Sequence, residues 1–96
     1  MARQRRPNAG EERMRIYFFG TDWSYPCKAS METWERFKDG NPELEAYYID
    51  IRRRPDMAKR YVVSKVPTFI SVDNGGREYK RFTRPPTSLD LRDLLR

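Results

Sequence analysis

Trp23-Ser24-Tyr25-Pro26-Cys27-Lys28 is the stretch of this chain that decides its fold. It follows an apolar run, Ile16-Tyr17-Phe18-Phe19, whose β-branched and aromatic residues are typical of a buried strand. Proline suits the first turn of a helix, so Pro26 predicts that a helix begins at this point. The stretch is therefore a junction between a strand and a helix, with Cys27 in the first turn of that helix.

Periodicity and turn signals extend this junction into seven elements in the order β-α-β-α-β-β-α. Strands joined by a helix should be parallel, with a right-handed crossover. Asn74-Gly75-Gly76 predicts a hairpin, because glycine supplies the positive φ that such turns demand. The pattern predicts strands at 14–20, 44–51, 68–73 and 77–82, helices at 26–39 and 55–61, and a last helix that starts at a T-x-x-D capping box, Thr87–Asp90.

Two of the expected helices carry an apolar face that identifies the side turned to the sheet. In the helix at 26–39 this face recurs every three residues, at Met31, Trp34 and Phe37. In the last helix we expect an apolar face made of leucines at 89, 91, 94 and 95. The fold class that follows is α/β, with a mixed four-stranded sheet flanked by helices.

Val66-Pro67-Thr68 follows Cys27 by about forty residues. With the strand, the junction and the hairpin, this triplet resembles the thioredoxin superfamily, in which a W-C-x-x-C-K motif opens a helix after a central strand. The resemblance covers residues 14–96 and implies the minimal thioredoxin fold. The topology is similar to that of small glutaredoxin-type members, whereas the motif and the V-P-T triplet are more similar to thioredoxin.

The resemblance implies a role for each residue of the site. Ser24 takes the exposed position of the attacking cysteine, at a helix N-terminus that favours a thiolate. Cys27 takes the position of the resolving cysteine, which is usually shielded. Pro67 matches a cis-proline that faces the motif, and Val66 would offer backbone hydrogen bonds to an extended peptide. The remaining groove wall would consist of Trp23, Tyr25 and Pro26.

Serine at position 24 predicts that dithiol turnover is lost in this chain. The pKa of a hydroxyl lies far above neutral, and the chain has no histidine to act as a base. Ser24 could still cap the helix through its side-chain oxygen. Two hypotheses follow. Either this is a disulfide oxidoreductase whose motif was Cys-Tyr-Pro-Cys before an engineered replacement, or it is a naturally degenerate, redox-inactive module that binds peptides.

Two further positions depart from the thioredoxin pattern. The buried strand aspartate that helps proton transfer at the resolving cysteine is replaced here by Phe18. A glycine that leaves room for substrate proteins after the last strand is not evident near Phe82-Thr83. Both departures predict that substrate choice differs from that of thioredoxin.

Composition excludes several classes of function. The 96 residues suffice for one domain, 14–96, preceded by a basic, polar arm at 1–13 that we expect to be disordered. One cysteine and no histidine exclude an intramolecular disulfide, a Cys-rich metal site and histidine-based catalysis. We therefore expect no cofactor and no metal. Because no apolar run could span a membrane and no secretory signal is visible, we expect a cytoplasmic location.

The net charge of +6 leaves a third hypothesis, association with nucleic acid. The basic clusters are Arg3, Arg5 and Arg6, and Arg52 to Arg54. Acidic residues are scattered throughout and no nucleic-acid-binding motif accompanies the charge, so a solvated tail and loop is the preferred interpretation. The expected partners are protein disulfides and a reductant, thioredoxin reductase or the glutathione system. We expect a monomer, because a shielded Cys27 is a poor link between chains.

Overall fold

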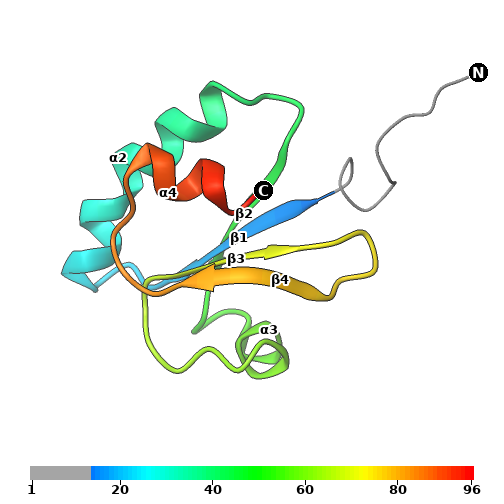
Figure 1. Ribbon diagram of the computed structural model, residues 1–96. Coiled ribbons are helices and arrows are strands. Elements are labelled where there is room, and N and C mark those ends of the chain that lie inside the picture. Colours follow the sequence, from blue (N-terminus) through cyan, green and yellow to red (C-terminus); the bar gives the residue numbers. More distant parts are fainter. Residues whose placement is uncertain (1–13) are drawn as a thin grey trace, which may run out of the picture.

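The computed structural model describes residues 14–96. The predicted arm at 1–13, with Arg3, Arg5 and Arg6, lies outside the described residues. The seven predicted elements follow one another in the predicted order (Figure 1). They are β1 (Arg15–Gly20), α2 (Tyr25–Asp39), β2 (Glu45–Asp50), α3 (Pro55–Arg60), β3 (Thr68–Val72), β4 (Glu78–Phe82) and α4 (Ser88–Asp93).

The strands form one mixed sheet in the order β2-β1-β3-β4. β1 and β2 are parallel and β3 is antiparallel to β4, as predicted. β3 also pairs antiparallel with β1. α2 and α4 cover one face of this sheet and α3 covers the other (Figure 1). Phe19 near the end of β1 lies opposite Thr68 at the start of β3. The segment that follows β1 and the segment that precedes β3 therefore lie at the same end of the sheet.

Alternation along β1 divides the core between the two faces. Ile16 and Phe18 join the cluster under α2 and α4. Tyr17 and Phe19 join the cluster on the side of α3. All four are buried, which confirms the predicted central strand with both faces covered.

Local signals place the hairpin and the last helix. Gly76 has a φ of +84°, so the predicted glycine of the β3–β4 turn adopts the left-handed conformation. Thr87 and Asp90 form the predicted capping box, in which each side chain accepts from the other residue's backbone N–H. The expected inward position of Leu89 is wrong, since this residue is 61% exposed. With only six residues, α4 turns Leu91 and Leu94 to the core and leaves the second residue of its first turn in solvent.

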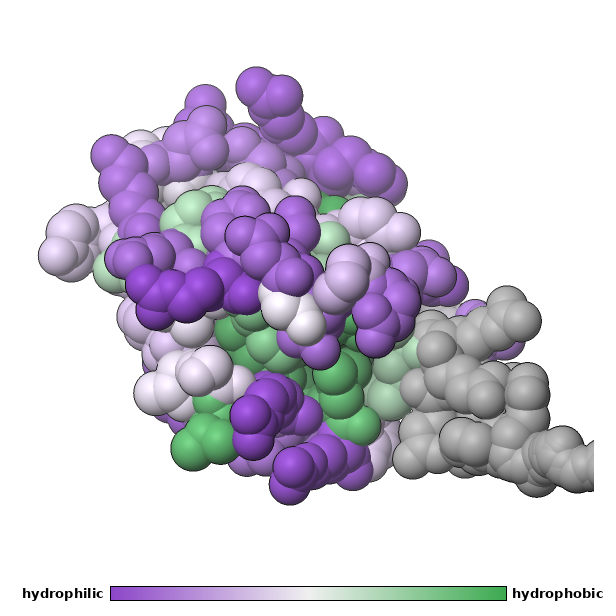
Figure 2. All heavy atoms as spheres, turned by 90° about the horizontal axis from the view of Figure 1, so that it is seen from above, coloured by the Kyte–Doolittle hydropathy of each residue, from purple (hydrophilic) through white to green (hydrophobic). Residues whose placement is uncertain are grey.

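The outer surface agrees with the strongly charged composition. Figure 2 looks onto the molecule from the side of α2 and α4, and hydrophilic residues cover most of this face. Hydrophobic residues show in a smaller area between them. Among residues 14–96 no helix is long and apolar enough to cross a membrane.

Candidate functional site

The site lies where β1 ends and α2 begins. Ser24 is the N-cap of α2, with an extended backbone, and its Oγ accepts a hydrogen bond of 3.4 Å from the backbone N–H of Cys27. The Ser24 carbonyl accepts from the N–H of Lys28 at 3.0 Å. Pro26 occupies the first turn, where its missing N–H costs no hydrogen bond. The predicted capping role of Ser24 is therefore present in the structure.

Ser24 is 8% exposed, although the resemblance predicted an exposed position. Its hydroxyl turns inward to cap the helix, while the side chains on either side turn outward. Trp23 is 69% exposed and Tyr25 is 78% exposed. Trp23 and Tyr25 are therefore exposed on either side of the buried Ser24. We call these two side chains the aromatic rim.

Cys27 is 1% exposed and lies on the inner side of α2. Its Sγ packs against the backbone of Gly20, where an added Cβ would lie only 2.9 Å from the sulfur. The same Cβ would lie 3.1 Å from the rings of Phe18 and Tyr48. Gly20 is therefore needed for this close approach between the end of β1 and the cysteine. The shielding predicted for Cys27 is present.

Val66 and Pro67 precede β3 and join the site through the sheet. The Val66–Pro67 peptide bond is cis. Pro67 is buried, Val66 is half-buried, and the Thr68 hydroxyl donates a 2.6 Å hydrogen bond to the Lys65 carbonyl. Antiparallel pairing of β1 and β3 brings this segment to the same end of the sheet as the motif. The topology thus brings together the two parts of the site that the sequence predicted.

Phe18 fills the position at which the resemblance places an aspartate. Its ring stacks on Phe69 with centroids 4.4 Å apart, and it meets Trp34 and Tyr48 edge-on at 5.4 and 5.0 Å. These rings surround an apolar position, where an unpaired carboxylate would be costly. Any proton transfer at Cys27 therefore involves other groups.

A cavity of about 260 Å³ lies beside Cys27, on the side of β2. It is lined by Thr21, Asp22, Cys27, Lys28, Met31 and Tyr48. Burial raises the pKa of Tyr48 to about 12, and the negative charges of Asp22 and Asp50 act in the same direction. Tyr48 therefore keeps its proton at neutral pH and remains a hydrogen-bond donor in this cavity.

No motif in the sequence predicts this cavity. Asp22 directly follows β1 and Tyr48 lies near the end of β2, so the parallel pairing of these strands brings them to one edge. That shared edge was the available signal, because side chains at the carboxyl ends of neighbouring parallel strands meet there.

Among the three arginines after β2, one guanidinium has an acidic partner within residues 14–96. Arg54 forms an ion pair with Asp56 at 2.9 Å, and the Arg52 backbone N–H donates to the Asp50 carboxylate. Arg54 lowers the pKa of Asp56 through this contact. Within residues 14–96, no group of three or more histidine, cysteine or acidic side chains is placed to hold a metal ion.

Comparison with known proteins gives one consistent result. The sequence model of the family described as Thioredoxin matches residues 8–96. Thioredoxin-2 of Saccharomyces cerevisiae is 32% identical over 73 residues, which cover 76% of this chain and 68% of that protein. Thioredoxin-1 of the same yeast is 28% identical over 65 residues, which cover 68% of this chain.

The chain spans less than two thirds of the length of several of these relatives. It spans 63% of yeast Thioredoxin-1, and 40% of a putative thioredoxin 2 from Streptomyces coelicolor, to which it is 30% identical over 56% of its own length. Among solved structures, Fasciola hepatica thioredoxin superposes with a TM-score of 0.78 at 26% identity, covering 86% of this chain and 78% of that one. Oxidised thioredoxin from Plasmodium falciparum, at 17% identity, has the same fold with a TM-score of 0.74, covering 91% of this chain and 82% of that one.

Proposed function

This chain belongs to the thioredoxin family, and from that premise we propose that it is a thiol–disulfide oxidoreductase whose dithiol cycle is interrupted at Ser24. One observation carries the proposal. An attacking thiolate would be stabilised at the N-cap of α2. In this chain that position holds the Ser24 hydroxyl, whose oxygen accepts a hydrogen bond from the backbone N–H of Cys27. As it stands, the chain is inactive in the turnover of protein disulfides.

The chemistry follows from the positions of two side chains. In a working pair, the first thiolate attacks a substrate disulfide and the second resolves the mixed disulfide, releasing a reduced product. Ser24 cannot begin this sequence, because no histidine exists to remove its proton. Cys27 retains the resolving role, and Val66, Pro67, Trp23, Tyr25 and Pro26 form the surface that receives the substrate chain.

The decisive experiment compares this chain with Ser24→Cys in reduction of insulin disulfides by dithiothreitol. We expect the unaltered chain to match the dithiothreitol background and Ser24→Cys to exceed it clearly. The control is Ser24→Cys combined with Cys27→Ser, which can attack but cannot resolve. Mixed with insulin in the absence of dithiothreitol, the reduced control should accumulate a stable mixed disulfide, because it lacks the thiol that would release the product. If Ser24→Cys folds, exposes two titratable thiols and remains inactive, the proposal fails.

A second function is favoured by the exposed aromatic rim. Trp23 and Tyr25 offer apolar area at the end of the sheet where Val66 and Pro67 lie. A redox-inactive module could hold an extended peptide there without any thiol chemistry. On this alternative, replacing Trp23 with alanine weakens peptide binding, whereas alkylation of Cys27 leaves it unchanged.

The substrates are protein disulfides, and the reductant of a repaired site is thioredoxin reductase or the glutathione system. We propose a cytoplasmic monomer made of one domain, 14–96, with residues 1–13 as a basic arm. Nucleic-acid association through the arginines is disfavoured by the engagement of Arg54 with Asp56. A steep loss of binding with salt would reinstate it.

A further inference from the structure

We propose that the cavity beside Cys27 binds disulfides of amino acids or short peptides, and that Cys27 forms a mixed disulfide with them there. The site opens on the side of β2, and is lined by residues outside the motif's proposed substrate groove. The proposed reaction uses one cysteine, Cys27, and does not depend on a second cysteine at position 24 or on dithiol turnover. Failure of Ser24→Cys to reduce insulin would leave it intact.

An unsatisfied polar group supports this assignment independently of the cysteine. Thr21 lines the same cavity and is 1% exposed. Its Oγ1 is buried and has no hydrogen-bond partner among the described residues. A buried hydroxyl without a partner is costly, so a ligand or water with a polar group near Thr21 would stabilise this arrangement.

The charges around the cavity indicate the class of ligand. A second cavity of about 450 Å³ shares Asp22 and Tyr48 with the first and continues to Asp50, Arg53 and Arg54. Together the two cavities have the size of a small-molecule site. Lys28 and Arg53 form no ion pair within residues 14–96 and can bind carboxylates.

Asp22 supplies the complementary charge between these two cations. It forms no ion pair within the described part of the chain, so it can bind an ammonium group. A ligand with carboxylates and an ammonium group, such as an amino acid or short peptide, fits this pattern better than a ligand of one sign. The Tyr48 hydroxyl, protonated at neutral pH, can donate to the same ligand.

The reaction is a thiol–disulfide exchange with one protein sulfur. Cys27 loses its proton to solvent, and the thiolate attacks one sulfur of the ligand disulfide. The Cys27–ligand S–S bond forms as the ligand's own S–S bond breaks. The other half of the ligand leaves as a thiolate and takes a proton from water. The small disulfide is the oxidant, so no further reactant is needed.

The first test measures adduct formation by mass spectrometry on the full chain with three probes at equal concentration. Oxidised glutathione carries carboxylates and ammonium groups, cystamine carries only ammonium groups, and bis(2-hydroxyethyl) disulfide is neutral. We expect one adduct per chain. Each probe's rate with the folded chain is divided by its rate with the chain unfolded in urea. This ratio should be about three- to tenfold larger for oxidised glutathione than for the other two probes. Equal relative rates, or an adduct only in urea, would overturn the proposal.

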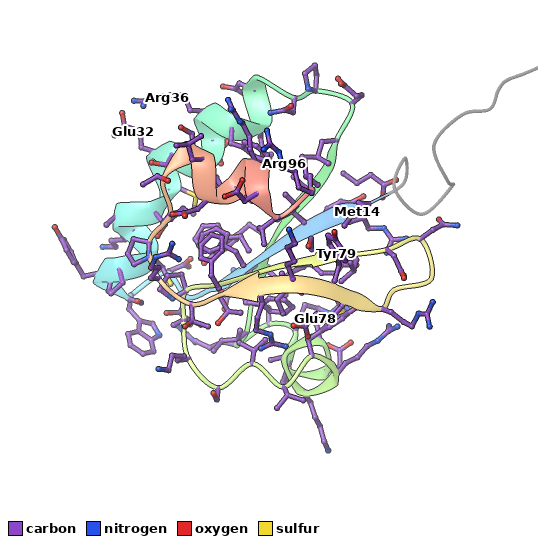
Figure 3. The ribbon with its side chains drawn as sticks, in the orientation of Figure 1. Met14, Glu32, Arg36, Glu78, Tyr79 and Arg96 are labelled. Atoms are coloured by element: carbon purple, nitrogen blue, oxygen red, sulfur yellow. The ribbon has the colours of Figure 1, made fainter. Side chains whose placement is uncertain are left out.

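The second test identifies the route to the sulfur. Arg53→Gln should slow the reaction with oxidised glutathione about three- to tenfold and leave the neutral probe unaffected. Arg36→Gln is the matched control, because Arg36 lies on the exposed side of α2 and pairs with Glu32 there (Figure 3). Equal effects of Arg53→Gln and Arg36→Gln would refute the proposed site.

A third variant closes the cavity. Met31 is half-buried and lines the cavity, so Met31→Trp should reduce adduct formation with all three probes while the thermal midpoint stays close to that of the parent. Glu35→Trp adds the same ring on the exposed side of α2, outside the cavity, and should have no effect. If Met31→Trp leaves the rate of adduct formation unchanged, or if Glu35→Trp lowers it equally, the disulfide does not reach Cys27 through this cavity and the inference is wrong.

Discussion

The two faces of the sheet differ in how much of the covering helix is buried. On one face, α2 buries four of its side chains against the sheet, Cys27, Ser30, Trp34 and Phe37. On the other face, α3 has six residues and none of them is fully buried. Its side of the core depends instead on Tyr61, the residue after the helix, whose hydroxyl donates a 2.8 Å hydrogen bond to the Gly76 carbonyl.

The cysteine and the strained part of the backbone lie on opposite faces of the sheet. Cys27 lies on the face where Phe18, Trp34 and Phe69 pack ring against ring. The face of α3 includes a strained residue, because the backbone of Val62 has a φ of +53°. A β-branched residue is rarely found in this left-handed region. The site therefore lies on the face whose covering helix buries more of its side chains.

The largest expected difference between the two faces is in stability, and two neighbouring residues of β1 test it. Phe18 and Phe19 are both fully buried, but they point to opposite faces. Each change to alanine should destabilise the fold by about 3–5 kcal/mol. Phe18→Ala should cost more by about 1 kcal/mol, because Phe18 meets three rings within 5.4 Å, whereas the ring centroids around Phe19 are 5.9 and 6.1 Å away.

Chemical denaturation of both variants measures this difference. A second readout is the rate at which Cys27 reacts with a thiol reagent under native conditions. It should rise for Phe18→Ala, which opens space next to the sulfur, and stay near the parent rate for Phe19→Ala. Equal losses of stability and equal thiol reactivity would show that the two faces do not differ as described.

The next test has the opposite sign and concerns the weaker face. Val62 follows the end of α3, where the Val63 N–H donates to the Ala58 carbonyl at 2.8 Å. This left-handed position at a helix end is one that glycine normally fills. Val62 is 76% exposed, so Val62→Gly loses little burial and should stabilise the fold by roughly 1 kcal/mol, measured by denaturation. Val62→Ala, which keeps a Cβ, is the control and should gain much less.

The order of elements could be predicted from the sequence, because each depends on local signals. Glycine at position 76, the capping box at Thr87–Asp90 and the apolar run before Gly20 each act within a few residues. The predicted faces were correct where a helix was long, as in α2. They were wrong at Leu89, because α4 is too short for its face to be read from spacing alone.

The candidate site could be predicted only in part. Position in the motif identified Ser24, Cys27 and Pro67, but the inward turn of Ser24 is set by a hydrogen bond that spacing does not encode. The cavity beside Cys27 depends on the pairing of β1 with β2, which brings Tyr48 beside Gly20 and Cys27. Nor did any local signal predict a left-handed valine at position 62.

The smallest expected effect concerns the helix starts on the two faces. α3 has no side-chain cap, whereas α4 is capped by Thr87 and Asp90. The backbone N–H of Thr87, together with its side chain and Arg84, holds the pKa of Asp90 below its usual value of 3.8. Ionised Asp90 therefore stabilises the fold fully above that value, and the contribution is lost as pH falls through the lower folded-state pKa.

Asp90→Asn should accordingly cost about 0.5–1 kcal/mol at pH 6 and close to nothing at pH 2. Free energies of unfolding, measured for parent and variant across this range, give the difference directly. Asp93→Asn on the same helix is the control, because the Asp93 side chain makes no ion pair within residues 14–96, and its cost should be small at both pH values. A cost of Asp90→Asn that stays constant with pH would show that the cap acts through shape alone, and the contrast between the capped and uncapped helices would then lose its electrostatic part.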